Sequence, residues 1–143
     1  MVELSFEDIG LDTEKSFEFI ISDLEKQKFL EITGDINPLH NDKSFAQKQG
    51  FADEVVYGML TASYLSTFAG VYLPGKYSII HSVEINFVKP VVLNDSPLKI
   101  TGKVVAKDER FGQITIKYNI TNRDGEKVCR GIMKVGLSNY NKN

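Results

Sequence analysis

The feature that most constrains the fold is the segment of residues 58–69, which is long enough for a helix and apolar on nearly every side. Its large side chains are aliphatic or aromatic, and its polar side chains carry only small hydroxyl groups. The apolar members are Met59, Leu60, Ala62, Tyr64, Leu65, Phe68 and Ala69, and the polar members are Thr61, Ser63, Ser66 and Thr67. A helix that is apolar all round is normally buried. The rest of the chain is therefore expected to wrap around it.

Five segments can supply this wrapping. Apolar and polar residues alternate along residues 15–21, 77–88 and 113–121, which indicates half-buried strands. Residues 98–107 and 126–137 also read as strands. Residues 94–97 and 122–125 read as turns, and the Asp-Gly pair in the second suits a tight hairpin. The pattern predicts an α+β fold, the hotdog architecture, in which an antiparallel sheet curls around one central apolar helix. A chain of 143 residues is close to the usual size of one domain, about 100–200 residues.

The helices before this core are predicted from their capping residues. Ser22 and Glu25 have the spacing of a capping box, so a helix should run to about Thr33, where Gly34 can end it. This helix is expected to bury four apolar side chains, those of Leu24, Phe29, Leu30 and Ile32. Asp42 can cap a short helix through Gln49, after an irregular stretch that contains Pro38. Residues 1–13 are expected to pack loosely, and residues 138–143 to fray.

Composition excludes several classes of partner. The net charge of −2 provides no basic field for nucleic acid or anionic lipid. No apolar run approaches the ~20 residues needed to span a membrane, and the N-terminus lacks an apolar signal core, so a cytoplasmic protein is expected. Cys129 is the single cysteine and only two histidines are present, so neither a disulfide framework nor a metal site is expected.

The chemistry is concentrated in the stretch GDINPLHND, residues 34–42, where Asp35, Asn37 and His40 lie within six residues. A carboxylate and an imidazole on one rigid loop can hold a water molecule between them and move its protons. Backbone N–H groups at the helix start at Gly58 can receive negative charge that develops on a thioester carbonyl oxygen, and glycine leaves room for its approach. A simpler interpretation stays open, in which Asp35 and Asn37 only cap turns and Gly58 is an ordinary helix start.

The blocks that carry these residues resemble the MaoC-like family of (R)-specific enoyl-thioester hydratases, which implies a single MaoC-like hotdog domain over residues 1–143. The similar blocks are GDINPLHND (34–42), YGMLTAS (57–63), LPGKYSI (73–79) and INFVKPV (85–91). The resemblance implies that Asp35 and His40 activate the catalytic water, that Asn37 shapes the site through hydrogen bonds, and that the Gly58 N–H polarises the thioester carbonyl.

The resemblance also assigns residues that border the substrate. A helix serine that lines the site in relatives falls on Ser66, and Ser63 lies one turn earlier on nearly the same face. Many relatives have histidine where this chain has Tyr57, which keeps the backbone donor of Gly58 but leaves the acyl preference and the carrier open. The Tyr57 hydroxyl could contact a polar substrate group, or its ring could simply pack.

The sequence thus predicts a hydro-lyase that reversibly hydrates trans-2-enoyl thioesters to (R)-3-hydroxyacyl thioesters. No cofactor is expected beyond the pantetheine of coenzyme A or acyl carrier protein in the substrate, and the resemblance implies a homodimer. The alternatives are a hotdog acyl-thioesterase and a non-catalytic subunit that binds acyl thioesters. His81, on the apolar face of the predicted 77–88 strand, is expected in the core or a cavity wall. Three isolated cations could contact phosphates of the carrier, namely Lys76, Lys89 and Arg130.

Overall fold

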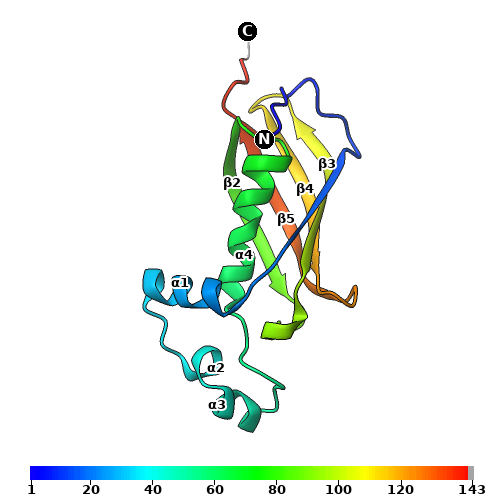
Figure 1. The fold of residues 1–143 in the computed structure, drawn as a ribbon. Coiled ribbons are helices and arrows are strands. Elements are labelled where there is room, and N and C mark those ends of the chain that lie inside the picture. Colours follow the sequence, from blue (N-terminus) through cyan, green and yellow to red (C-terminus); the bar gives the residue numbers. More distant parts are fainter. Residues whose placement is uncertain (142–143) are drawn as a thin grey trace.

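One antiparallel sheet forms the body of the molecule, and helix α4 lies along one of its faces (Figure 1). The structure is a computed structural model that describes residues 1–141. The strands follow the order β1-β3-β4-β5-β2 across the sheet, so β1 and β2 form its edges. Their bounds are β1 Glu14–Phe19, β2 Ser78–Phe87, β3 Leu98–Asp108, β4 Gln113–Thr121 and β5 Lys127–Leu137. This arrangement confirms the predicted hotdog architecture, and each predicted strand agrees to within two residues at either end.

Alternation of apolar and polar residues along the central strands explains why one face of the sheet is buried. In β4, Ile114, Ile116 and Ile120 are fully buried, whereas Lys117 is exposed. The buried face meets the side chains of α4 and of the π-type turn that continues it, η1 (Phe68–Tyr72).

Gly102 in β3 is part of this contact. A Cβ atom there would lie 2.5 Å from Cζ of the buried Phe68 ring, so the close approach of helix and sheet requires glycine.

Four helices precede the second strand, with bounds α1 Asp23–Thr33, α2 Pro38–Asn41, α3 Lys43–Lys48 and α4 Gly58–Thr67. The predicted caps are confirmed. The backbone N–H of Ser22 donates to the Glu25 carboxylate at 3.0 Å, and Gly34 ends α1 in the left-handed conformation. Asp42 caps α3 by accepting a hydrogen bond from the backbone N–H of Phe45. The turn of helix at α2 was not predicted; it begins at Pro38, whose fixed φ suits the first helical position.

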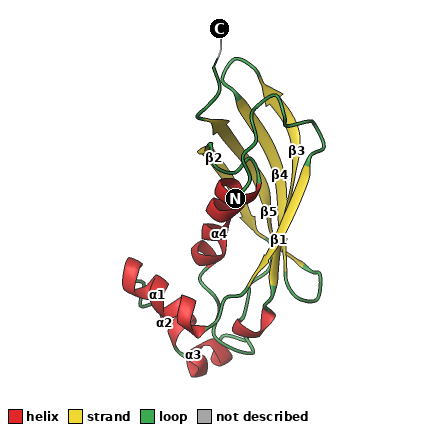
Figure 2. Ribbon diagram, turned by 45° about the horizontal axis from the view of Figure 1, so that its top comes forward, coloured by secondary structure: helices red, strands yellow, loops and turns green. Residues whose placement is uncertain are grey.

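Helix α4 is not surrounded as the sequence predicted. Its sheet-facing residues Leu60, Thr61 and Leu65 are buried, but Met59 and Ser63 on the opposite side are exposed. The sheet covers only one side of the helix, as Figure 2 shows, and α1 faces another part of it across an apolar cavity.

Helix α1 is the second correction. Leu24 and Ile32 were expected to be buried, but they are 59% and 83% exposed, while Phe29 and Leu30 are half-buried. The reason is placement, because α1 lies with α2 and α3 beyond the end of the sheet (Figures 1 and 2). The side chain that α1 does bury is Lys26, which forms an ion pair with Glu54.

The chain ends also differ from the prediction. The N-terminal arm is packed rather than loose, since Phe6 and Ile9 are buried in the main core. The ring of Tyr140 packs against Phe6 with 4.8 Å between ring centroids, so this part of the C-terminal tail is anchored. The predicted fraying of residues 142–143 lies outside the described residues. Within residues 1–141, no helix is both long and apolar enough to cross a membrane.

Candidate active site

The loop that carries Asp35 is held by its own side chains. The Asp35 carboxylate accepts a hydrogen bond from the Asn37 N–H at 3.1 Å, and the Asn37 side-chain oxygen accepts one from the Leu39 N–H at 2.9 Å. These two turns place Pro38 at the start of α2, whose single turn presents His40. Asn37 therefore does cap a turn, as the simpler interpretation proposed, and through that turn it also sets the position of His40.

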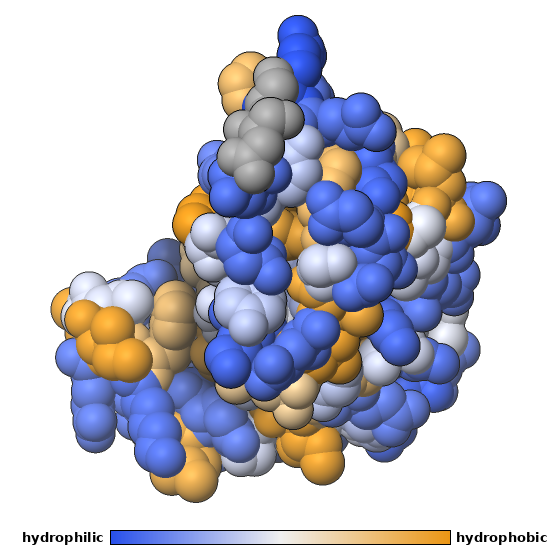
Figure 3. Space-filling view, turned by 90° about the horizontal axis from the view of Figure 1, so that it is seen from above, coloured by the Kyte–Doolittle hydropathy of each residue, from blue (hydrophilic) through white to orange (hydrophobic). Residues whose placement is uncertain are grey.

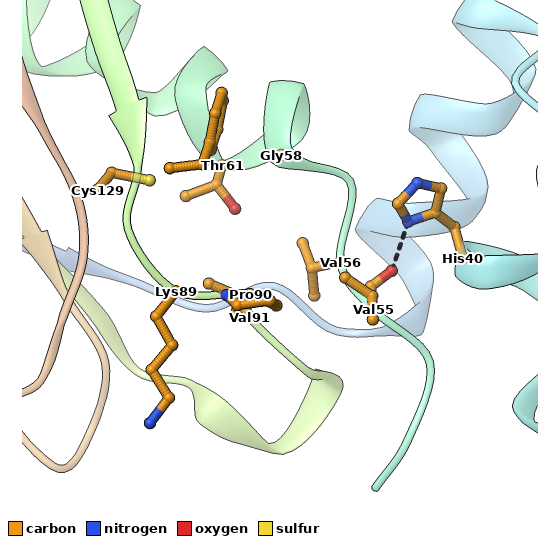
Figure 4. Close-up of a pocket in the computed structure, with 10 residues that line it drawn as sticks. His40, Val55, Val56, Gly58, Thr61, Lys89, Pro90, Val91 and Cys129 are labelled. Carbon is orange, nitrogen blue, oxygen red and sulfur yellow. Dashed lines mark hydrogen bonds between the residues drawn. The ribbon is translucent and has the colours of Figure 1, made fainter. Parts of the chain in front are cut away.

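The tautomer of the neutral His40 ring follows from its partner. Its Nδ1 lies 2.7 Å from the backbone oxygen of Val55, which can only accept a hydrogen bond (Figure 4). In the neutral ring Nδ1 must carry the proton, so Nε2 keeps a lone pair and can act as a base. The Val55 segment is fixed in turn by its N–H, which donates to Leu39 O at 3.1 Å, and by the buried Lys26–Glu54 pair immediately before it.

Tyr57 joins this loop to the start of α4. It is only 2% exposed, and its hydroxyl donates to the backbone oxygen of Asp35 at 2.6 Å. The ring lies against the His40 imidazole, with 4.2 Å between centroids, and against Phe29 at 4.8 Å. The hydroxyl is therefore engaged by the protein, and of the two predicted roles the structure supports packing.

Asn41 is a supporting residue that sequence reasoning missed. Its side-chain amide donates to the Tyr57 hydroxyl at 2.9 Å and to the backbone oxygens of Asn37 and Asp35 at 3.1 and 3.3 Å. The residue lies inside the quoted motif, but its polar type alone does not indicate contacts with a residue sixteen positions away.

The first turn of α4 supplies donors. The N–H groups of Leu60 and Thr61 donate to Tyr57 O at 3.1 and 3.2 Å, whereas those of Gly58 and Met59 have no acceptor within the helix. The helix dipole adds partial positive charge there. The missing side chain of Gly58 makes room for protein rather than for a ligand, since a Cβ atom would lie 2.9 Å from Cε1 of Phe87.

Two adjoining cavities bring these groups together. The larger, of about 570 Å³, is lined by Phe29, Thr33, Asp35, His40, Tyr57, Gly58, Met59 and Phe87. The smaller, of about 190 Å³, is lined by His40, Val55, Val56, Gly58, Thr61, Phe87, Lys89, Pro90, Val91 and Cys129 (Figure 4). His40, Gly58 and Phe87 line both, so the imidazole and the helix start border each of the two cavities. Asp35 lines the larger cavity only.

The two predicted serines lie farther along α4. Ser63 lines a separate apolar cavity between α1 and α4, which shares Phe29 with the larger cavity, and its hydroxyl donates to Leu60 O at 2.6 Å. Ser66 is exposed one turn later. Neither serine lines the two cavities that contain His40, so their proximity to substrate stays a prediction.

His81 was wrongly placed in the core or a cavity wall. It is exposed, at the point where the pairing of β2 with β5 shifts register between Ile80 and Ser82, and its Nδ1 lies 2.7 Å from Nε2 of Gln113. It is six residues from Phe87 along the strand, or about 20 Å.

Two of the three isolated cations form ion pairs. Lys76 pairs with Glu3 at 3.1 Å, and Lys89 pairs with Glu126 at 2.7 Å. The hydrogen bond from Lys89 lowers the pKa of the Glu126 carboxyl, and the same bond raises the pKa of Lys89. Arg130 lines a groove on the outer face of the sheet. Over residues 1–141, no group of three or more His, Cys, Asp or Glu side chains is placed to hold a metal ion.

Comparison with known proteins connects this geometry to a family. Residues 11–125 match the model of the family described as MaoC like domain. The chain is 35% identical over 92 residues to the 3-hydroxybutyryl-CoA dehydratase of Methylorubrum extorquens, an alignment that covers 64% of this chain and 59% of that protein. It is 42% identical over 67 residues to an (R)-specific enoyl-CoA hydratase of Aeromonas caviae, an alignment that covers 47% of this chain and 50% of that protein. The chain thus spans little more than half the length of these curated relatives.

The fold comparison extends over nearly the whole chain. The solved structure of an (R)-hydratase from A. caviae involved in PHA biosynthesis superposes with a TM-score of 0.86 at 29% identity, covering 92% of this chain and 98% of that one.

Proposed function

Since the chain belongs to the MaoC like domain family, we propose that it catalyses the reversible hydration of trans-2-enoyl thioesters to (R)-3-hydroxyacyl thioesters. The observation that carries the proposal is the larger cavity, which Asp35, His40 and Gly58 at the start of α4 line together. The substrate is attached to the pantetheine of coenzyme A or of acyl carrier protein, and no further cofactor takes part.

The water is activated by the loop. A water molecule that donates to the Asp35 carboxylate and to Nε2 of His40 presents its oxygen to C3 of the enoyl group. Nε2 is available because Nδ1 is bound to Val55 O. As the new C–O bond forms, one proton of the water passes to one of these two groups and is delivered to C2, so that water adds across the double bond.

The helix start stabilises the charge. While C3 bonds to oxygen, the electrons of the double bond move toward the thioester, and its carbonyl oxygen becomes enolate-like. The Gly58 N–H, without an intrahelical acceptor, can donate to that oxygen, and the helix dipole favours the negative charge.

The hydration rate of crotonyl-CoA tests the proposal. Asp35→Asn and His40→Ala are each expected to lower kcat by roughly two to four orders of magnitude, the range of acid–base catalysis. Asparagine keeps an oxygen that can accept the hydrogen bond from the Asn37 N–H, so the loop should persist. His81→Ala is the matched control, because this exposed histidine lies near the start of β2, whereas the cavities adjoin Phe87 at the end of that strand. Near-wild-type turnover in both loop variants refutes the assignment. Release of free thiol without hydration would indicate a thioesterase, and binding without turnover a non-catalytic subunit.

The same family membership supports a homodimer, and the surface gives a physical reason. Edge strand β2 exposes Ile79, Ile80 and Val83, and the uncovered side of α4 exposes Met59. Exposed apolar side chains on an unpaired edge strand favour association with a second chain. Figure 3 shows apolar side chains exposed among hydrophilic ones, including on the projecting helical part at its left.

Light scattering at micromolar concentration is expected to give the mass of a dimer, and Val83→Lys on the edge is expected to shift it toward the monomer. A monomeric wild-type protein would contradict this part of the proposal.

A further inference from the structure

Thr61 carries a buried polar atom that the fold leaves without a partner. Its side chain is on α4, the residue is 1% exposed, and its Oγ1 has no hydrogen-bond partner within residues 1–141, where it is the one such side-chain atom. Buried hydroxyl groups in folded proteins are nearly always hydrogen-bonded. An orphaned hydroxyl of this kind therefore calls for an explanation.

The helix itself does not engage this hydroxyl. Ser63, on the same helix, turns its hydroxyl back to Leu60 O at 2.6 Å. The corresponding acceptor for Thr61 is Gly58 O, three residues earlier, but its hydroxyl bonds neither that atom nor Tyr57 O, which already accepts from the Leu60 and Thr61 N–H groups. A carbonyl oxygen has two lone pairs, so both are in use.

The hydroxyl points into the candidate site. Thr61 lines the smaller cavity with Gly58 and His40, and Figure 4 shows its oxygen directed into that space. Most of the other lining groups are valine, proline and phenylalanine side chains, which offer no hydrogen-bonding atoms. Burial raises the pKa of the Cys129 thiol in the same wall to about 11, which keeps it neutral.

Thr61 and Gly58 are three residues apart, so they lie on the same face of the helix, with about 5–6 Å between the corresponding positions. One oxygen atom placed between them can accept from both the Gly58 N–H and the Thr61 hydroxyl. We infer that the Thr61 hydroxyl is the second donor to the thioester carbonyl oxygen, beside the Gly58 N–H. The inference rests on the proposed function and names a further catalytic residue for it. Thr61 keeps its proton throughout and only strengthens its hydrogen bond as charge moves onto the carbonyl oxygen.

Thr61→Val tests this, because valine matches the shape of threonine and lacks only the hydroxyl. Removing one donor to an oxyanion typically lowers kcat by ~10²–10³-fold, and we expect a loss of at least about tenfold here, with KM changed by less than about threefold. Thr61→Ser, which restores the hydroxyl, should recover most of kcat. The melting temperature of Thr61→Val should equal or exceed that of the wild type, since the variant removes an unpaired buried polar group. Thr67→Val, at the exposed end of α4, is the matched control.

An unchanged kcat in Thr61→Val overturns the inference, as does a rise in KM alone. A clear loss of thermal stability also overturns it, because the hydroxyl would then have a structural partner. Absence of turnover in the wild type refutes the proposed function instead, and the infrared carbonyl stretch of bound 3-hydroxybutyryl-CoA then tests Thr61. A lower stretching frequency in the wild type and in Thr61→Ser than in Thr61→Val supports a direct hydrogen bond to the carbonyl oxygen, and an equal frequency in all three proteins excludes it.

Discussion

Replacing Gly58 by proline removes the proposed backbone donor with little change to the helix. Gly58 is the first residue of α4, a position where proline is favoured because its missing N–H has no intrahelical acceptor. Proline also constrains the residue before it, and Tyr57, with φ −54° and ψ 123°, already has the extended conformation that this requires. The local backbone therefore accepts the substitution.

Gly58→Ala is the matched control, because both substitutions add a Cβ atom and only proline removes the N–H. That Cβ would lie 2.9, 3.3 and 3.4 Å from three atoms of the Phe87 ring. Phe87 is 50% exposed, so the ring can rotate away, and the stability cost should stay below about 1 kcal/mol. The displaced ring lines both cavities, so alanine alone should reduce activity up to roughly tenfold.

The ratio of kcat between Gly58→Ala and Gly58→Pro measures the contribution of the Gly58 N–H to the reaction. One oxyanion donor is worth ~10²–10³ in kcat, or about 2.7–4 kcal/mol. Gly58→Pro should therefore hydrate crotonyl-CoA at least about a hundredfold more slowly than Gly58→Ala, at similar melting temperature. A proline variant within about fivefold of the alanine variant would show that the Gly58 N–H does not stabilise the reaction.

Three further predictions address the fold around the site. Ser22→Ala should lower the free energy of unfolding by about 0.5–1 kcal/mol at pH 7. The hydrogen bond from the Ser22 side chain lowers the pKa of Glu25 from its ordinary 4.5. The stabilisation from this bond is therefore present above pH 4.5 and is lost as pH falls through the lower pKa of the folded state. Urea unfolding should accordingly show a smaller difference in unfolding free energy between wild type and Ser22→Ala at pH 3 than at pH 7. Gly102→Ala should cost at least ~1–3 kcal/mol, because its Cβ would lie 2.5 Å from the fully buried Phe68 ring, and a urea midpoint equal to the wild type would contradict this packing. Long-range ¹H–¹⁵N NMR at pH 8 should find the neutral His40 ring protonated on Nδ1, which faces Val55 O. The neutral His81 ring should be protonated on Nε2, because its Nδ1 faces the Gln113 amide nitrogen. The same tautomer in both rings would disprove one of the two contacts.

The features predicted correctly are those that neighbouring residues decide. The Ser22–Glu25 cap, the Gly34 helix end and the 122–125 hairpin each depend on a few adjacent residues, and all three are present. The burial of α1 was wrong because an amphipathic pattern shows that a helix has an apolar face but not which element will cover it.

Two other failures have a similar cause. The alternation of residues 77–87 continues through His81, although the pairing shifts register there, so the sequence gives no sign that this side chain leaves the core face. The contacts of Tyr57 with Asp35 and Asn41 join segments sixteen or more residues apart, and no local pattern encodes such a contact.

The orientation of Asp35 and His40 and the shape of the cavity wall depend on different contacts. Asp35 is fixed through Tyr57, and His40 through Val55, so the two proposed catalytic groups are oriented by residues of one chain. The walls that would meet an acyl group are different, since Met59 and Phe87, which line the larger cavity, are 64% and 50% exposed. It follows that a change in assembly should alter the choice of acyl chain more than the chemical step. A Val83→Lys variant that dissociates the proposed dimer should therefore retain the His40 tautomer while it loses discrimination between short and long enoyl thioesters.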